Sequence, residues 1–283
     1  KILYFKSRWE VAETMTLESF IEKASEEKYD GVECSLLFEG VIENPDKLKD
    51  LINKHNLNYN GFIWCGGSTP KEQIDHFDSQ FQKTLALNPK VINLHIGKDH
   101  FTYEENIEIY NHVLDCYENV LKTNPDLLVT FETHRSRPTF CVRDTIHYIN
   151  VLKDRPFYIN LDISHWMVVH ESETLEEQAE KIIKHVLPRV RHIHARVGFS
   201  QGPQVTSLLY PIFKQNIDAH LGFWQKVIDL SRSTRDSFTM LMEHGPFPYQ
   251  HATQEKEEEK MKTIVDVWKM NHIMRDIIQK RIK

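Results

Sequence analysis

Apolar residues recur along the chain in two alternating patterns. Short runs rich in β-branched and aromatic residues predict strands, and between them apolar residues spaced three or four apart predict amphipathic helices. The helix that begins at Thr16, for example, gathers Leu17, Phe20, Ile21 and Ala24 on one face. The predicted strands span residues 2–5, 29–34, 59–64, 91–96, 127–132, 157–162, 190–195 and 238–242.

Helices are predicted between the strands, beginning at residues 16 and 45 and spanning 71–87, 103–121, 144–152, 174–186, 220–230 and 254 to about 282. The alternation has a repeat of roughly 30 to 35 residues, which predicts a (β/α)8 barrel, or TIM barrel. An open doubly wound sheet is the main competitor. The Gly-x-Gly-x-x-Gly turn typical of that fold does not occur among the 10 glycines of this chain. No linker rich in proline, glycine or serine interrupts the pattern, so we expect residues 1–283 to form a single domain.

Two segments depart from this rhythm. Residues 198–219 form the longest stretch without clear periodicity, and because they follow a strand with site candidates, we expect a lid or substrate loop there. The last predicted helix mixes many charges with apolar residues such as Val267, Trp268 and Met274. It can cover the barrel or contribute to a contact between subunits. We expect this helix to cover the barrel, and we leave open whether the protein forms a homo-oligomer.

Composition narrows the class of protein. The 283 residues are 40% hydrophobic and 27% charged, which is typical of a soluble enzyme with a large core. A net charge of −6 argues against nucleic acid as the main partner, because phosphate backbones need a positive surface. No apolar run approaches the roughly 20 residues that span a bilayer, and the N-terminus lacks the order of a signal peptide, so no membrane partner is expected. The scattered cysteines form neither a disulfide framework nor a thiolate zinc site, and we expect a cytoplasmic protein.

Chemically capable side chains stand where four neighbouring strands end. Glu132, Asp162, His194 and Glu243 lie at the ends of the fifth to eighth predicted strands. Because parallel barrels carry their sites at the carboxyl ends of the strands, these side chains should share one rim. Three carboxylates this close repel one another, whereas a divalent metal stabilises them, and oxygen and imidazole ligands suit Mn²⁺, Mg²⁺, Co²⁺ or Zn²⁺. Any one of the four can instead be a helix cap or a surface ion pair, and Asp162 is a candidate cap of the next turn.

Strand alternation separates candidate ligands from their neighbours. His192, His194 and Arg196 fall on one face of the seventh strand, which should point into the barrel. His194 lies nearer the carboxyl end, so we take it as the ligand and His192 as a hydrogen-bonding residue of the barrel. His134 lies on the same side as the carboxylate of the fifth strand and can orient that carboxylate or touch substrate. His95 closes the fourth strand and is a further candidate for substrate contact.

Four short motifs resemble the xylose isomerase-like barrels, a group of sugar phosphate isomerases and epimerases that includes endonuclease IV in distant form. The resemblance covers nearly the whole chain, and its specific motifs are Glu132-Thr-His-Arg, Asp162-Ile-Ser-His165, His192-Ile-His-Ala-Arg196 and Glu243-His-Gly-Pro. It implies that the four strand-end residues bind one divalent metal ion and that His165 and Arg196 hold the substrate. It also implies that Glu132 and Glu243 move a proton through a cis-enediolate intermediate.

The chemistry agrees with this expectation. A metal that chelates a hydroxyl and the adjacent carbonyl acidifies the neighbouring C–H and stabilises the enediolate charge. Arg196 or Arg137 can bind a carboxylate, phosphate or hydroxyl group at the far end of the substrate, and both can equally be ion-pair partners on a loop. The chain also departs from the family. Epimerases of the group often place an arginine several residues beyond the histidine ligand, whereas Arg196 follows after one intervening residue, and the multi-histidine set of a trinuclear zinc site is not evident.

These observations lead to one favoured function and three alternatives. We expect a divalent-metal-dependent isomerase or epimerase that acts on a sugar, sugar phosphate or polyol through Glu132 and Glu243. A lyase of the inosose dehydratase type would use the same enediolate and then expel a hydroxyl group. A zinc phosphodiesterase of the endonuclease IV type and a barrel that binds sugar without turnover are the other two.

Overall fold

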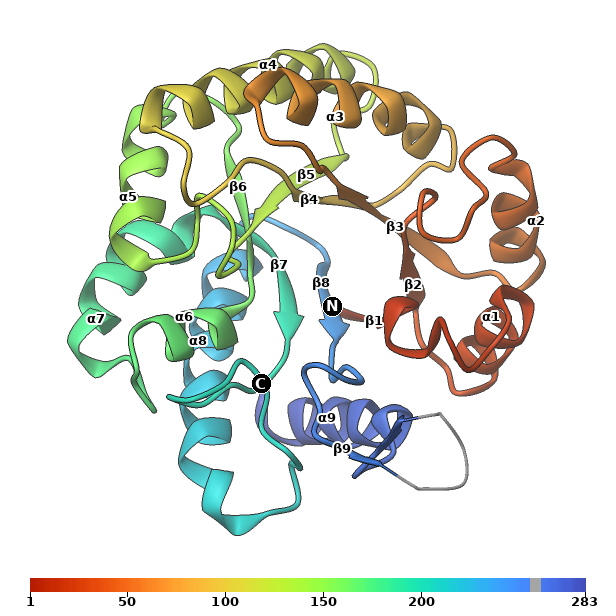
Figure 1. The fold of residues 1–283 in the computed structure, drawn as a ribbon, viewed down its shortest axis with the longest axis vertical. Coiled ribbons are helices and arrows are strands. Elements are labelled where there is room, and N and C mark those ends of the chain that lie inside the picture. The colour runs from red at the N-terminus through yellow and green to blue at the C-terminus, as the bar shows by residue number, and fades with distance from the viewer. Residues whose placement is uncertain (255–260) are drawn as a thin grey trace.

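The computed structural model describes residues 1–254 and 261–283, and eight parallel strands form its centre. Each strand pairs with its neighbour in the sequence, and β1 pairs with β8 to close the barrel, with Ile2 opposite Phe238 (Figure 1). The predicted (β/α)8 barrel is therefore confirmed. The barrel strands are β1 (Ile2–Ser7), β2 (Gly31–Cys34), β3 (Asn58–Trp64), β4 (Val91–His95), β5 (Leu128–Glu132), β6 (Tyr158–Leu161), β7 (Val190–Ala195) and β8 (Phe238–Met242).

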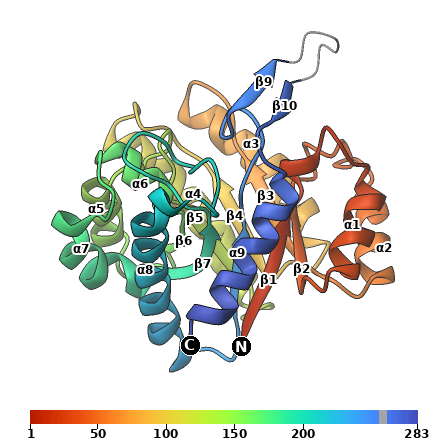
Figure 2. The same cartoon turned by 90° about the horizontal axis from the view of Figure 1, so that it is seen from below.

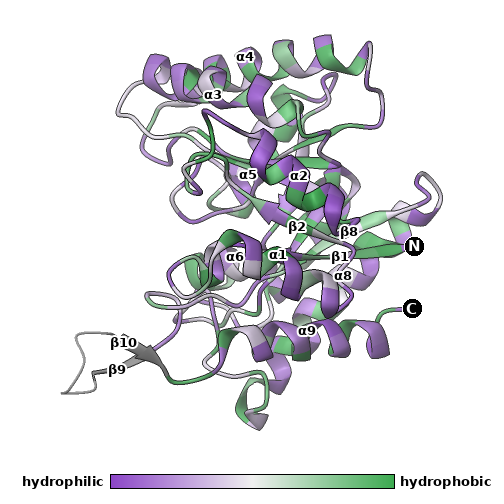
Figure 3. Cartoon of the chain, turned by 90° about the vertical axis from the view of Figure 1, so that its right-hand side faces the viewer, coloured by the Kyte–Doolittle hydropathy of each residue, from purple (hydrophilic) through white to green (hydrophobic). Residues whose placement is uncertain are grey.

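Helices surround the barrel and bury their apolar faces against it. The outer helices carry hydrophilic and hydrophobic positions side by side (Figure 3), as expected for elements with one buried face. In the first helix Thr16 caps the opening turn by accepting a hydrogen bond from the Ser19 N–H at 3.1 Å. The α-helices are α1 (Leu17–Glu26), α2 (Asp46–Lys54), α3 (Pro70–Leu85), α4 (Tyr103–Leu121), α5 (Val142–Val151), α6 (Ile163–Val169), α7 (Glu176–Lys181), α8 (Lys214–Arg232) and α9 (Val267–Arg281). Shorter turns are η1 (Trp9–Val11), the π-helical η2 (Ile182–Val186), η3 (Leu187–Arg189) and η4 (Pro211–Phe213).

The interior of the barrel is unusually polar. Leu3, Phe5 and Leu241 form a small apolar cluster of their own there. The middle layer holds buried amide, hydroxyl and imidazole side chains, namely Asn60, Asn93, Thr130, Asn160, His192 and Thr239. Interiors of this fold are ordinarily filled by bulky branched residues. A polar layer therefore indicates a barrel built to support a polar site above it.

The predicted helix from residue 254 to about 282 is wrong over its first part. Helix α9 begins at Val267, and the short strands β9 (Ala252–Gln254) and β10 (Met261–Thr263) pair as an antiparallel hairpin before it. Residues 255–260 of that prediction lie outside the described residues. Asp266 explains where the helix starts, because its side chain accepts a hydrogen bond from the Lys269 N–H at 3.0 Å. Figure 2 shows the hairpin at the end of the barrel where the strands finish, with both termini at the opposite end.

Three other helical segments differ from the prediction. Helix α6 was not expected, because its apolar run reads as a continuation of the preceding strand. Helix α8 begins at Lys214 rather than at residue 220. The helix predicted at 174–186 is divided between α7 and the π-helical turn η2. These differences move element boundaries without changing the order of the barrel.

Helix α9 covers the barrel, as favoured from the sequence. Trp268, Met270, Met274 and Ile278 on α9 are buried, and the Trp268 ring lies 6.1 Å from that of Phe20 on α1. All four cysteines are free thiols. Within residues 1–254 and 261–283, no helix is both long and apolar enough to cross a membrane.

Candidate metal and substrate site

A pocket of about 440 Å³ lies at the carboxyl ends of the strands. Asp162 and His165 are fully buried beside it and contact Arg196, whose Nη1 is 3.3 Å from Asp162 Oδ2 and 3.1 Å from His165 Nε2. The segment 198–219, expected as a lid, supplies none of the described residues that line the pocket. Instead, Gln204 in that segment accepts a hydrogen bond from the Gly245 N–H at 2.7 Å and supports the loop after β8. The pocket wall includes the other predicted site residues, His95, Glu132, His134, Arg137, His194, Arg196 and Glu243.

His194 lies at the centre of the acidic group. Its Nδ1 is 2.8 Å from Glu243 Oε2 and 3.3 Å from Glu132 Oε2. Its Nε2 faces the other way and is 3.4 Å from Glu33 Oε1. The imidazole therefore stands among three carboxylates, from β2, β5 and the end of β8, and turns Nδ1 toward the two that were predicted to move a proton.

Arg196 bridges two of the predicted metal ligands. Its Nη2 donates to Glu243 Oε1, and its Nη1 lies 3.3 Å from Asp162 Oδ2. Asp162 Oδ1 in turn accepts hydrogen bonds from the Ser164 N–H at 3.0 Å and from its hydroxyl, so Asp162 also caps α6, as the alternative interpretation anticipated. The Tyr249 ring lies 4.2 Å from the guanidinium of Arg196. A direct contact between Arg196 and substrate stays a prediction.

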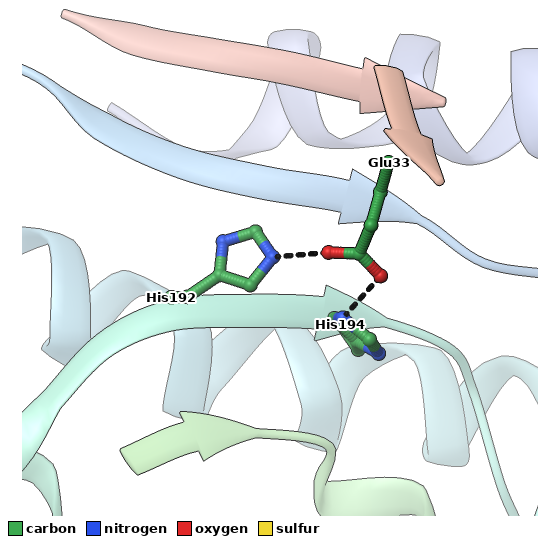
Figure 4. A group of neighbouring side chains, drawn as sticks. All are labelled: Glu33, His192 and His194. Atoms are coloured by element: carbon green, nitrogen blue, oxygen red, sulfur yellow. Dashed lines mark ion pairs between the residues drawn. The ribbon is translucent and has the colours of Figure 1, made fainter. Parts of the chain in front are cut away.

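Glu33 on β2 is a site residue that the sequence reasoning missed. Its carboxylate lies between His192 and His194 of β7, with Oε2 3.7 Å from His192 Nε2 and Oε1 3.4 Å from His194 Nε2 (Figure 4). His192 Nδ1 contacts the Thr239 backbone oxygen and hydroxyl at 3.0 and 2.7 Å, which agrees with its expected hydrogen-bonding role. A carboxylate at one ring nitrogen of a histidine orients the other nitrogen toward a metal. The sequence held one signal for Glu33, namely an acidic residue in an apolar strand that ends at the same rim as the other site residues.

Neighbouring charges shift the pKa values of the site. Burial opposes ionisation of Glu132, yet the imidazoles of His194 and a second histidine hold its pKa well below the ordinary value. Burial also opposes ionisation of Glu243, whose pKa Arg196 and His194 lower. Burial raises the pKa of Asp162 to about 7 against the influence of Arg196. Burial lowers the pKa of His194, but the carboxylates around it raise that pKa well above its usual range. Glu132 and Glu243 are therefore ionised at neutral pH.

The donor set fits a divalent cation. Four carboxylates, from Glu33 and the three predicted acidic ligands, are buried beside one guanidinium. Even with His194 protonated, one negative charge exceeds the positive ones among these side chains, or two when Asp162, whose pKa is about 7, is ionised, and burying such an excess is costly. Asp162 Oδ2, His194 Nδ1 and Glu243 Oε2 have no well-directed hydrogen bond, and ligand atoms of these three residues lie within 4.8 Å of one another. Glu132 belongs to an overlapping group of the same kind.

Three histidines flank the carboxylates. His95 Nε2 lies 3.0 Å from Glu132 Oε2, so His95 rather than His134 contacts this carboxylate directly. His134 Nε2 is 3.3 Å from the Tyr249 hydroxyl, and its ring centroid is 4.0 Å from that of His165. Burial lowers the pKa of both His134 and His165 well below the ordinary value. Both rings are therefore neutral, and His134 and His95 face the pocket as hydrogen-bonding groups.

Arg137 is buried in the pocket wall. Its Nη1 donates to the backbone carbonyls of Cys65 and Gly97 at 3.2 and 3.1 Å. These carbonyls follow β3 and β4, so the guanidinium ties two strand ends together. Among the described residues Arg137 has no ion-pair partner, so the loop ion pair considered from the sequence is not found, and its contact with substrate stays a prediction.

Three further residues support the paired carboxylates and carried no distinctive signal in the sequence. Asn93 and Asn160 donate to Glu132 Oε2 at 2.6 and 3.2 Å. The indole N–H of Trp9 donates to Glu243 Oε1 at 3.0 Å. Asparagine and tryptophan are common for many structural reasons, so only their position in the folded barrel reveals the role.

The sequence matches no protein-family model and no curated protein. Solved structures match the fold. The D-allulose 3-epimerase from Methylomonas sp. in complex with D-allulose is 13% identical over 99% of this chain and 97% of that chain, with a TM-score of 0.66. The IOLI protein with a bound zinc atom is 14% identical over 99% of both chains, with a TM-score of 0.64. The probable 3-DHS dehydratase AsbF from Bacillus anthracis is 14% identical over 99% of both chains, with a TM-score of 0.62.

The chain therefore has the (β/α)8 TIM barrel fold of these structures, which also include a xylose isomerase domain protein from Alicyclobacillus acidocaldarius that is 12% identical, with a TM-score of 0.63. Within that fold the structures similar to this chain include epimerases, a dehydratase and a zinc-binding protein.

Proposed function

We propose that the protein is a divalent-metal-dependent isomerase or epimerase of a sugar or sugar derivative, in which Glu132 and Glu243 move the proton. The observation that carries the proposal is that both carboxylates lie within 3.3 Å of His194 Nδ1 at the wall of one pocket. The similar structures with D-allulose and with zinc support a sugar ligand and a metal ion.

Glu132 is suited to accept a proton. Its Oε2 is held by Asn93, Asn160 and His95, and among the described residues no hydrogen bond reaches its Oε1. The low pKa keeps the group ionised, so Oε1 can take a proton from a sugar C–H in the pocket. Fixed donors on the other oxygen keep the carboxylate from rotating while it does so.

Glu243 is suited to act on the other side of the sugar. Its Oε1 accepts from Trp9 and Arg196, which leaves Oε2 directed to His194. A divalent metal held by Glu132, Asp162, His194 and Glu243 would polarise a hydroxyl and an adjacent carbonyl and stabilise the enediolate. Arg196 keeps Asp162 and Glu243 in place, while the neutral ring of His134 and the ring of His95 face the pocket, where they can contact sugar hydroxyls.

Solvent exchange tests the proposal. Protein stripped with a chelator and reloaded with Mn²⁺, Co²⁺, Mg²⁺ or Zn²⁺ is incubated with a panel of ketoses in D₂O and followed by NMR. We expect deuterium at the carbon next to the carbonyl only with metal, and loss of exchange in Glu132→Gln and Glu243→Gln. Asp99→Asn, an exposed carboxylate on the loop after β4 that does not line the pocket, is the matched control and should exchange normally.

The same experiment separates the alternatives. Exchange accompanied by loss of water would assign a lyase, and exchange that survives the chelator and both glutamine variants would contradict the proposal. Tight sugar binding without exchange would assign a binding protein. One metal ion per chain would count against a phosphodiesterase with several zinc ions.

A further inference from the structure

The pocket has two chemically different halves. Glu132, His194 and Glu243 occupy the side of β5, β7 and β8, and Glu33 reaches His194 from β2. The opposite side is aromatic: Phe62 and Trp64 point into the pocket from β3, and Phe38 follows β2. The Phe38 ring centroid lies 6.1 Å from that of Phe62 and 6.0 Å from that of Trp64. Phe38 is 56% exposed, so a broad apolar surface is open to the ligand rather than buried against the protein.

The cationic side chains of the pocket are already engaged. Arg8 Nε lies 3.1 Å from Glu39 Oε2, and its Nη2 donates to the Met15 carbonyl at 2.9 Å. Arg137 donates to two backbone carbonyls, and Arg196 is shared between two carboxylates. No lysine is among the described residues that line the pocket. An incoming phosphate would have to draw Arg8 or Arg196 away from a carboxylate, and the N–H groups without a partner, Arg8 Nη1, Arg137 Nε and Arg196 Nε, are buried. It would also meet the excess of carboxylates.

Among the described residues, the first glycine amides after β3, β4, β7 and β8 are also already hydrogen-bonded. Barrels of this kind commonly bind phosphate through glycine-rich loops after β7 and β8. Here the Gly198 N–H donates to His220 Nε2 at 3.2 Å and the Gly245 N–H to Gln204 Oε1 at 2.7 Å. The glycine amides after β3 and β4 are used in the same way, Gly66 by His76 Nδ1 at 3.2 Å and Gly97 by Gln73 Oε1 at 3.0 Å.

From these contacts we infer that the substrate is an uncharged sugar bearing an apolar group, not a sugar phosphate. Its hydroxy-ketone lies between Glu132 and Glu243, and its apolar group lies against Phe38, Phe62 and Trp64. The inference rests on the proposed function, since that function places the reacting carbons. The inference adds the chemical nature of the group at the far end of the substrate, which is apolar and uncharged.

A matched ligand series tests this inference. D-Fructose, its 6-phosphate and its 6-O-benzyl ether share one hydroxy-ketone and differ only at the far end, and the same three derivatives of D-tagatose form a second series. Binding to the manganese-loaded protein is measured by calorimetry and by the fluorescence of Trp9 and Trp64. We expect the benzyl ether to bind at least tenfold more tightly than the parent sugar, and the phosphate at least tenfold more weakly. Equal or tighter binding of the phosphate, no gain from the benzyl group, or no binding by either series would overturn the inference.

A pair of variants locates the apolar contact. Phe38→Ala should reduce the preference for the benzyl ether by about three- to tenfold, because it removes one aromatic face. Tyr210→Ala is the matched control: Tyr210 is 47% exposed and does not line the pocket, so the wild-type preference should be kept. An unchanged preference in Phe38→Ala with unchanged thermal stability would contradict the assigned position.

Solvent exchange distinguishes the two ideas. Exchange into fructose 6-phosphate in preference to the neutral ligands would leave the isomerase or epimerase intact and remove the substrate assignment. If the ligands bind in the expected order but no member of the series exchanges, the substrate assignment would be kept and the isomerase or epimerase would be contradicted.

Discussion

Replacing Arg196 with methionine tests how the site distributes its charge. Arg196 is buried between Asp162 and Glu243, with Nη1 3.3 Å from Asp162 Oδ2. At an effective dielectric constant of about 20, one such pair attracts by about 5 kcal/mol before desolvation is counted. Removing one partner of a buried pair leaves the other charge uncompensated and costs roughly 3–5 kcal/mol. We therefore expect R196M to lower the free energy of unfolding of the metal-free protein by this amount.

The same variant should gain more stability from metal than the wild type does. The guanidinium and a bound cation share two carboxylates, so removing the first favours the second. Urea unfolding with chelator and with excess Mn²⁺ measures both increments. Arg8→Met is the control, because it breaks the buried pair with Glu39 at 3.1 Å and leaves the four predicted ligands intact. An Mn²⁺ increment in R196M no larger than that of the wild type would refute the reasoning.

Three other predictions follow from the site and its supports. Glu132→Gln should lower kcat by about 10²- to 10⁴-fold, because it removes the proton acceptor, and steady-state kinetics on an identified substrate would show it; near-normal turnover would exclude the role. Glu33→Gln should weaken Mn²⁺ binding by about 10- to 100-fold through the orientation of His194, and calorimetry that finds equal affinity would reject this coupling. Burial lowers the pKa of His220 to about 4, against its hydrogen bond to Asn216, so the folded state stays neutral where the unfolded state binds a proton. Stability should therefore fall as the pH drops from about 6.5 toward 4, by about 3 kcal/mol in total, and His220→Gln should flatten this dependence in urea titrations.

The barrel could be predicted because its signals are local and repeated. Each strand is an apolar run, and the carboxyl ends of parallel strands meet at one rim, so Glu132, His194 and Glu243 could be brought together without knowing any distance. The helix boundaries were less certain for a physical reason. The charged segment before Val267 has high helix propensity, yet the helix starts only where Asp266 caps it.

The contacts between side chains could not be predicted in the same way. Glu33 is one acid in a short strand, and only the closed barrel brings it across to β7. Arg196 falls on the expected inward face, but whether its guanidinium meets substrate or Asp162 depends on how the side chain extends. Asn93 and Asn160 became visible as donors to Glu132 only once β4, β5 and β6 were in register.

The polar interior beneath the rim sets a limit on how this protein can be improved by design. Filling it with valine or leucine at Asn93 and Asn160 would be an obvious way to raise thermal stability, since buried amides gain little and Asn160 Oδ1 lacks a partner among the described residues. The same exchange would strip Glu132 of both amide donors and let its carboxylate rotate. A thermostable variant obtained this way would thus retain the barrel and forfeit the geometry of the proposed base.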